Sequence, residues 1–191
     1  MYRCQNEEYG TVDAYLKEQI TKSNQRHWVL IFVVPTLLTA LAAWILFGFV
    51  FELEVVRGNS MNPGFYDGQL LLASRTVQSP EFGDVVILNN SDSNDYIKRI
   101  VGLPGDTLNI DNESGRFIRN GEILDEPYAW GKTLKLQGGI EFPVTLQENE
   151  YFVLGDNREH SNDSRYFGSV DIARIKAKIT LQSSVKQNET N

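Results

Sequence analysis

The longest apolar stretch of the chain runs from Trp28 to Phe51 and contains no charged residue. As a helix rising about 1.5 Å per residue it would span roughly 36 Å, more than the ~30 Å hydrocarbon core of a bilayer. A cleavable signal peptide has a shorter apolar core of about 7–15 residues followed by small residues, whereas Glu52 and Glu54 follow this stretch. A core helix of this length would normally keep a polar face. The pattern therefore predicts a transmembrane helix over residues 28–51.

The charges around this stretch predict its orientation. Lys17, Lys22 and Arg26 precede it, while acidic residues follow it directly. Basic residues collect on the cytoplasmic side of membrane proteins, and acidic residues count little in this rule. We therefore expect residues 1–27 to form a cytoplasmic tail and everything after the helix to lie on the extracytoplasmic face.

Beyond the predicted helix the pattern changes to short apolar runs separated by Gly, Asn, Asp and Pro, which is typical of β structure. The candidate strands are 53–57, 69–74, 84–88, 96–101, 116–119, 141–146, 151–154 and 172–181. No amphipathic helix of convincing length follows the apolar stretch. The sequence thus predicts a mainly β domain over 52–186, with residues 107–150 as a small insertion that carries no chemical motif. Residues 187–191 are polar and are predicted to be a disordered tail.

Charge and composition exclude several kinds of function. The chain has a formal net charge of −7, which disfavours nucleic acid as a partner. The single cysteine, Cys4, lies in the predicted cytoplasmic tail, so the outer domain has neither a disulfide nor a cysteine nucleophile. The two histidines, His27 and His160, do not form a cluster suited to zinc. We expect no metal and no cofactor.

The first segment with candidate chemistry surrounds Ser60, a few residues after the predicted helix. Ser60 lies between Gly58 and Pro63, in a turn that can present its hydroxyl on a rigid bend. A lone serine in such a turn is usually only a turn residue. This segment alone therefore does not identify a nucleophile.

The second segment is the predicted strand 96–101. Strand alternation puts Tyr96, Lys98 and Ile100 on one face, so the lysine has an apolar neighbour on each side. In one interpretation its stem packs and its ammonium reaches water. In the other, burial lowers its pKa from about 10.4 toward the ~7–8 that a general base needs near neutral pH.

The third segment, residues 151–165, is an apolar strand that ends in a dense polar loop. Such a loop can be a solvated turn held by Asp and Asn side chains. The mixture of both charge signs favours a hydrogen-bonded scaffold instead.

Together, the three segments resemble bacterial signal peptidase I, the leader peptidase family, whose members are serine–lysine dyad proteases. The resemblance covers the apolar stretch and nearly all of the following domain except about 107–150. It is carried by Ser60-Met61-x-Pro63, Lys98-Arg99-x-Val101-Gly102-Leu103-Pro104-Gly105-Asp106 and Gly155-Asp156-Asn157-Arg158-x-x-Ser161-x-Asp163-Ser164-Arg165. Three such motifs in the family's order behind a single anchor are highly specific. The resemblance implies an antiparallel β-sheet catalytic domain of signal-peptidase type.

The resemblance also implies roles for individual side chains. Ser60 matches the nucleophile and Lys98 the general base, which fits the chemistry because a serine hydroxyl attacks poorly unless a base takes its proton. Ser161 matches the residue that hydrogen-bonds and orients the lysine. Asp163 and Arg165 match an ion pair that holds the loop. The reaction would proceed through an acyl-enzyme.

The implied substrates are exported preproteins with cleavable N-terminal signal peptides, whose cleavage sites carry small residues at the first and third positions before the scissile bond. A narrow apolar pocket would explain this preference by steric exclusion. The residues that match its walls are Val56, Met61, Phe65, Tyr96 and Ile97. The resemblance further implies a place in the bacterial plasma (inner) membrane, with lipid as a partner.

Two positions depart from the family pattern. Some members have a serine where this chain has Gly58, and that serine donates a hydrogen bond to the oxyanion. The backbone N–H of Ser60 would then be the main donor, with Gly58 giving close approach or a second N–H. The other departure is Gly64, where the family usually has Thr or Ser, and we expect it to leave the nucleophile turn less restrained.

Several alternatives compete with this interpretation. Self-cleaving repressor-type peptidases use a similar Ser–Lys pair, but they are soluble and usually carry a DNA-binding domain. A peptidase dedicated to one secretion or conjugation system would have the same sequence features. An inactive, membrane-tethered β domain that binds exported proteins is a third alternative. The presence of Ser60, Lys98 and Ser161 disfavours it. A Ser-His-Asp hydrolase is set aside because His160 is directly adjacent to Ser161.

Overall fold

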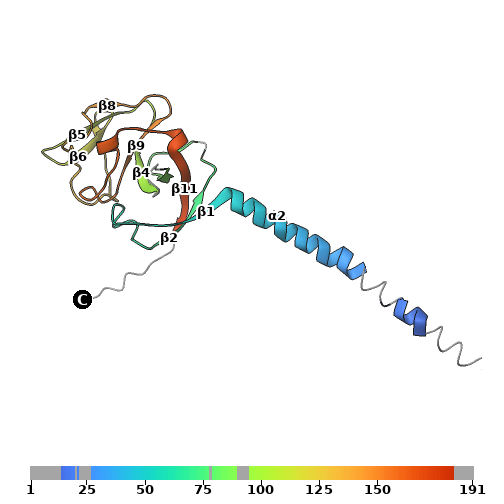
Figure 1. Cartoon of the computed structure of the whole chain (residues 1–191). Coiled ribbons are helices and arrows are strands. Elements are labelled where there is room, and N and C mark those ends of the chain that lie inside the picture. Colours follow the sequence, from blue (N-terminus) through green and yellow to red (C-terminus); the bar gives the residue numbers. More distant parts are fainter. Residues whose placement is uncertain (1–13, 20, 22–26, 78, 90–94, 183–191) are drawn as a thin grey trace, which may run out of the picture. The chain divides into compact units, whose positions relative to one another are not determined.

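The computed structural model describes residues 14–19, 21, 27–77, 79–89 and 95–182. The chain divides into two compact units, Met1–Gly48 and Phe49–Asn191 (Figure 1). The tail predicted over 187–191 and most of the tail predicted over 1–27 lie outside the described residues.

The first unit contains all but the last two residues of the apolar helix. A π-helical segment, η1 (Val29–Val33), continues directly into α2 (Val34–Val50). Together they form one helix, Val29–Val50, that is long and apolar enough to cross a membrane. The prediction placed Phe51 in this helix, but Phe51 opens strand β1, where it pairs with Ser74. The hydrophobic pattern missed this boundary because the first strand residue is as apolar as the helix before it.

The second unit is mainly β, as predicted, and its strands pair in antiparallel fashion. The larger sheet has the order β1 (Phe51–Val55), β2 (Leu70–Ser74), β11 (Ile175–Gln182), β3 (Val85–Leu88), β4 (Tyr96–Gly102), β9 (Glu150–Leu154) and β10 (Val170–Asp171). The smaller sheet has the order β7 (Glu122–Ile123), β6 (Arg116–Arg119), β5 (Thr107–Asp111) and β8 (Val144–Thr145). Short helical turns, α3 (Ser164–Phe167) and η2 (Ile172–Arg174), precede β10 and β11.

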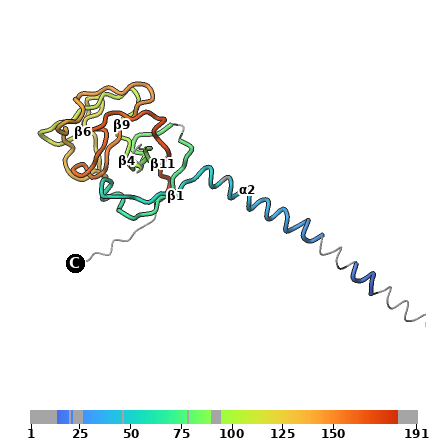
Figure 2. Tube along the Cα trace, viewed as in Figure 1, coloured from blue at the N-terminus to red at the C-terminus, as the bar shows by residue number. Residues whose placement is uncertain are grey.

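The smaller sheet shows that residues 107–150 have their own architecture. Strand β5 was not predicted, although Leu108 and Ile110 are buried and alternate with the more exposed Thr107 and Asn109. These two side chains join Phe117 and other residues in a separate hydrophobic cluster. The polar residues between the apolar ones concealed the strand in the sequence. Figure 2 traces these residues, coloured from green-yellow to orange, in the neighbourhood of β6.

The core also fixes the turn that carries Ser60. Val56, Met61 and Phe65, which flank this serine, are buried in a hydrophobic cluster with Leu71 of β2 and other strand residues. A turn whose apolar neighbours are buried cannot move without exposing them to water, so the backbone of the Ser60 turn is held in place.

Candidate active site

Ser60 lies in the connection between β1 and β2. The N–H of Val56 donates to the carbonyl of Gln69 at 2.9 Å, and the N–H of Phe65 donates to the carbonyl of Met61 at 2.9 Å. These bonds close the connection before and after Ser60. The serine is therefore presented on a turn that is fixed at both ends.

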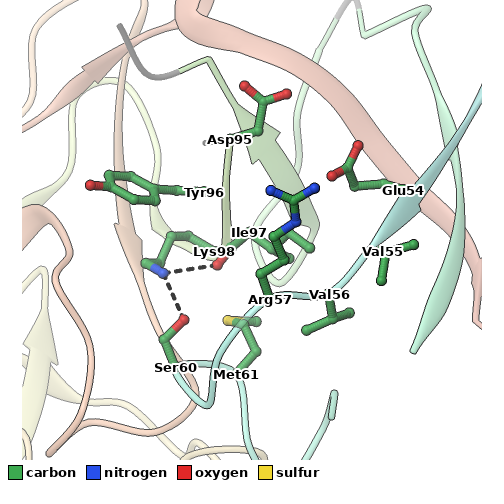
Figure 3. A pocket seen from close by; sticks show the side chains of 10 residues that line it. All are labelled: Glu54, Val55, Val56, Arg57, Ser60, Met61, Asp95, Tyr96, Ile97 and Lys98. Atoms are coloured by element: carbon green, nitrogen blue, oxygen red, sulfur yellow. Dashed lines mark hydrogen bonds between the residues drawn. The ribbon is translucent and has the colours of Figure 1, made fainter. Parts of the chain in front are cut away.

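Lys98 lies in the middle of β4, where its partner on the neighbouring strand β3 is Val86. Its Nζ donates to Ser60 Oγ at 2.9 Å and to the carbonyl of Ile97 at 3.0 Å (Figure 3). Lys98 is only 3% exposed. The structure thus brings together the two residues that the sequence assigned to nucleophile and base.

The surroundings of Lys98 favour its neutral form. Burial lowers the pKa of Lys98 from 10.5 to about 8, against the opposing effect of the Asp163 and Asp156 carboxylates, which raise it. The ring of Tyr96, whose centroid lies 5.4 Å from Nζ, also favours the ammonium. Burial prevails because the amine loses its hydration, and a neutral amine can accept a proton from the serine hydroxyl.

Ser161 does not make the predicted hydrogen bond to Lys98. Its Oγ is buried and has no hydrogen-bond partner among the described residues, while the Lys98 amine donates to Ser60 and Ile97. A Cβ on Gly155 would collide with Ser161 Oγ and with the carbonyl of Ser60. Gly155, which follows β9, therefore lets Ser161 pack close to the backbone of the nucleophile.

The predicted ion pair between Asp163 and Arg165 is present and lies in the interior. Arg165 Nε is 2.9 Å from Asp163 Oδ1, and both side chains are buried. Asp163 also caps α3 and accepts the N–H of Gly155 at 3.1 Å. The guanidinium of Arg165 donates to the carbonyl of Arg158 at 2.7 Å. The pair thereby ties both halves of the loop after β9 together.

Asn157 connects this loop to the Ser60 turn, a role that the sequence did not reveal. Its backbone N–H donates to the carbonyl of Ser60 at 3.0 Å, and its Nδ2 donates to the carbonyl of Asn59 at 3.1 Å. The only signal in the sequence was its position within the third motif. The two bonds set the backbone of the nucleophile relative to the loop.

The departure at Gly64 has a structural reason. Arg99 of β4 pairs with the fully buried Asp156 through two hydrogen bonds of 2.8 and 2.7 Å. A Cβ on Gly64 would lie 2.8 Å from Asp156 Oδ2. The turn packs directly on this ion pair at Gly64, with little room for a side chain, and the expectation that Gly64 leaves the turn less restrained stays a prediction.

Residues 107–150 also support the loop after β9. The guanidinium of Arg158 donates to both carboxylate oxygens of Glu126, at 2.9 and 2.7 Å, and to Thr133 Oγ1 at 2.6 Å. The backbone N–H of Trp130 donates to the carbonyl of Asp156, and the carbonyl of Trp130 accepts the N–H of Arg158. The segment that carried no chemical motif thus contributes one half of a buried ion pair.

We expect Glu126→Ala to destabilise the second unit by about 3 kcal/mol, because removal of one partner leaves the Arg158 charge buried and unpaired. Arg158 is 2% exposed, so water cannot replace the lost carboxylate. Denaturant unfolding followed by circular dichroism measures this loss. Glu148→Ala, at an exposed position, is the matched control and should leave stability unchanged. A loss below about 1 kcal/mol for Glu126→Ala would contradict the assignment.

A cavity of about 160 Å³ adjoins Ser60 and Lys98. Four of the predicted wall residues line it, namely Val56, Met61, Tyr96 and Ile97. The fifth, Phe65, does not; its ring is buried in the core below the turn. The remaining lining residues are Glu54, Val55, Arg57 and Asp95. In Figure 3 the Arg57 side chain extends between Asp95 and Glu54, so one side of the cavity is polar.

Gly58 cannot supply the second oxyanion donor. Its N–H donates to Asp67 Oδ1 at 2.7 Å, and its φ of 79° explains the preference for glycine. A Cβ there would meet no protein atom within 4 Å. The N–H of Ser60 donates no hydrogen bond within the described part of the chain. Within those same residues, no group of three or more His, Cys, Asp or Glu could hold a metal ion.

Comparison with known proteins identifies the family of this chain. A family described as signal peptidase, peptidase S26, matches residues 25–183. The chain is 35% identical over 165 residues to signal peptidase I of Bacillus licheniformis, which covers 80% of this chain and 87% of that protein. It is 38% identical over 154 residues to signal peptidase I S of Bacillus subtilis strain 168, with 75% and 80% covered. A crystal structure of a signal peptidase I from Enterococcus faecalis V583 is 30% identical, with a TM-score of 0.44, and covers 55% of this chain and 100% of that one. The chain therefore belongs to the signal peptidase family, peptidase S26.

Proposed function

We propose that this protein is a membrane-bound serine endopeptidase that removes N-terminal signal peptides from exported preproteins. The observation that carries the proposal is the 2.9 Å hydrogen bond between a buried lysine amine and Ser60 Oγ. Membership of the peptidase S26 family and the relatives named signal peptidase I support the substrate class.

In the proposed mechanism the neutral Lys98 amine takes the proton of Ser60 as Oγ attacks the carbonyl carbon of the scissile bond. The resulting oxyanion accepts a hydrogen bond from the Ser60 N–H. The C–N bond then breaks, and the Lys98 ammonium gives its proton to the leaving amine. Water, deprotonated by the same amine, attacks the ester carbonyl; the bond to Ser60 Oγ breaks, Lys98 returns the proton to that oxygen, and the signal peptide is released.

The cavity beside the dyad supports a preference for small side chains. Its volume is about 160 Å³, and the side opposite the polar residues is bounded by buried apolar side chains, including Val56 and Met61. Core-like walls do not yield to a larger side chain without strain. A substrate with small residues before the scissile bond would therefore bind, and one with bulky residues would be excluded.

The apolar helix supports the proposed location in the bacterial plasma membrane, with residues 1–27 in the cytoplasm. Ser60 follows Val50, the last residue of this helix, by ten residues, which reach at most about 35 Å when extended. A signal peptide held in the same membrane would be confined near the enzyme, which raises its effective concentration.

The proposal is tested by incubating the purified chain in detergent with a reporter preprotein. We expect a single cut after a small residue, located by sequencing the new N-terminus. An acid quench followed by mass spectrometry should find the signal peptide as an acyl group on the fragment that contains Ser60. The proposed function fails if the preprotein stays intact, or if the acyl group is found on another residue.

The pKa of Lys98 predicts the pH dependence of the reaction. Protonated Lys98 cannot accept a proton, so kcat/KM should fall about tenfold per pH unit below pH 8 and level off above it. The measurement is kcat/KM between pH 6 and pH 9.5, with the fold checked by circular dichroism at each pH. A rate that is independent of pH over this range, or that falls as pH rises through 8, would be incompatible with a lysine base.

A further inference from the structure

A second groove adjoins the same turn as the dyad. Its volume is about 470 Å³, and it shares no lining residue with the cavity at Lys98. Ser60 and Met61 line the cavity, whereas Asn59 and Asn62 of the same turn line the groove. The Ser60 turn thus separates two concave sites, and the proposed mechanism assigns a role only to the cavity at Lys98.

Two buried amide oxygens on the lining of the groove lack a partner. Neither Asn62 Oδ1 nor Asn157 Oδ1 has a hydrogen-bond donor among the described residues, and Asn157 is only 6% exposed. The Asn157 amide is held in place, because its Nδ2 donates to the carbonyl of Asn59. A buried acceptor without a donor is costly and rare in native proteins. Two residues of the lining therefore carry unsatisfied acceptors, and the Asn157 acceptor is held in place.

The rest of the lining is largely aromatic, with Tyr66, Trp130 and His160 beside Asn59 and Pro63. Trp130 is 53% exposed, while its backbone is bonded to Asp156 and Arg158 of the loop after β9. Pro63 and Tyr66 line the groove beside it, and none of the lining residues is Asp, Glu, Lys or Arg. A fixed, exposed indole next to buried acceptors is typical of a binding site for an apolar chain with a polar backbone.

We propose that this groove binds the substrate segment that follows the scissile bond, which becomes the N-terminus of the released protein. The inference rests on the proposed function. If the residues before the bond occupy the cavity at Lys98, the chain after the bond has to continue past Ser60, and the groove begins at the neighbouring residues of that turn. The first five residues after the bond would span about 17 Å if extended. Apolar side chains against Trp130 would be preferred there over charged ones.

The first test compares two substrates that are identical before the scissile bond. One continues for five residues after it, and the other ends in p-nitroaniline as a small leaving group. We expect Trp130→Ala to lower the ratio of kcat/KM, long over short, about tenfold, because a central aromatic contact is lost. Leu134→Ala, which removes an exposed apolar side chain that does not line the groove, should keep the ratio of the wild type. A ratio unchanged by Trp130→Ala would overturn the inference.

The second test needs no catalysis and so stands apart from the proposed function. Trp130 is the only tryptophan after residue 48. With Trp28 and Trp44 changed to Phe and Ser60 to Ala, the pentapeptide that follows the bond should shift Trp130 fluorescence in a saturable way. A pentapeptide with two central aspartates should bind at least about fivefold more weakly, because no lysine or arginine lines the groove to pair with the carboxylates. Absence of any shift at millimolar pentapeptide would overturn the inference, even if the Ser60 and Lys98 variants behave as proposed.

Discussion

Ser60→Ala is expected to lower kcat by at least about 10⁴-fold, because no other group in the site can form the acyl-enzyme and loss of a nucleophile removes the whole covalent route. The hydroxyl makes one hydrogen bond, to Lys98, whereas the Ser60 carbonyl keeps its bond from Asn157. The turn should therefore keep its shape in the variant. The measurement is the rate of preprotein cleavage at saturating substrate, with near-ultraviolet circular dichroism as the check of the fold.

Ser114→Ala is the matched control for this substitution. Ser114 is exposed and also makes a single side-chain hydrogen bond, to Asp111. Its removal should leave kcat unchanged. If Ser60→Ala retained more than about 1% of the wild-type kcat, Ser60 would not be the nucleophile. The chain would then be a hydrolase that uses another side chain as its nucleophile.

Lys98→Met is expected to abolish cleavage to a similar extent while making the protein more stable. Methionine has nearly the same length and is apolar, so it can occupy the buried site without the cost of burying an amine. The displacement of the Lys98 pKa from 10.5 to about 8 corresponds to roughly 3 kcal/mol of destabilisation when the amine is protonated. Lys98→Arg should also be inactive, since a guanidinium stays charged and cannot act as a base.

The sign of the stability change depends on pH. Below pH 8 the amine is charged in both the folded and the unfolded chain, so the full penalty of burial is present. Between about pH 8 and 10.5 the unfolded chain binds the proton and the folded chain does not, so the free energy of unfolding of the wild type rises with pH. Above 10.5 both forms are neutral and the penalty is gone.

The advantage of Lys98→Met should therefore be largest at pH 7 and should shrink as the pH passes from 8 to 10.5. Denaturant unfolding of both proteins at several pH values measures this difference. A variant that is less stable than the wild type at pH 7 would show that the amine is solvated, and a variant that still cleaves would remove Lys98 from the mechanism. A stable but inactive Lys98→Met protein separates loss of the base from loss of the fold.

The sequence by itself was sufficient for the elements whose signals are local. A run of uncharged residues long enough to span a membrane predicted the helix. Short apolar runs separated by turn residues predicted most strands of the larger sheet. The resemblance carried by the three motifs was enough to select Ser60 and Lys98. The hydrophobic pattern failed where two neighbouring elements are equally apolar, as at Phe51. It also failed where polar residues between the apolar ones conceal a strand, as in β5 (Thr107–Asp111).

Only the tertiary structure decided what each candidate side chain contacts. Ser60 and Lys98 are 38 residues apart in the chain, and the burial that lowers the lysine pKa comes from packing that no single segment contains. The sequence also did not show that the N–H of Gly58 donates to Asp67. Nor did it show that Ser161 Oγ has no hydrogen-bond partner within the described residues. The Glu126–Arg158 pair gave residues 107–150 a role that no motif had indicated. Periodicity records which face of an element avoids water, whereas solvation and hydrogen bonding depend on which distant residues meet when the strands pair.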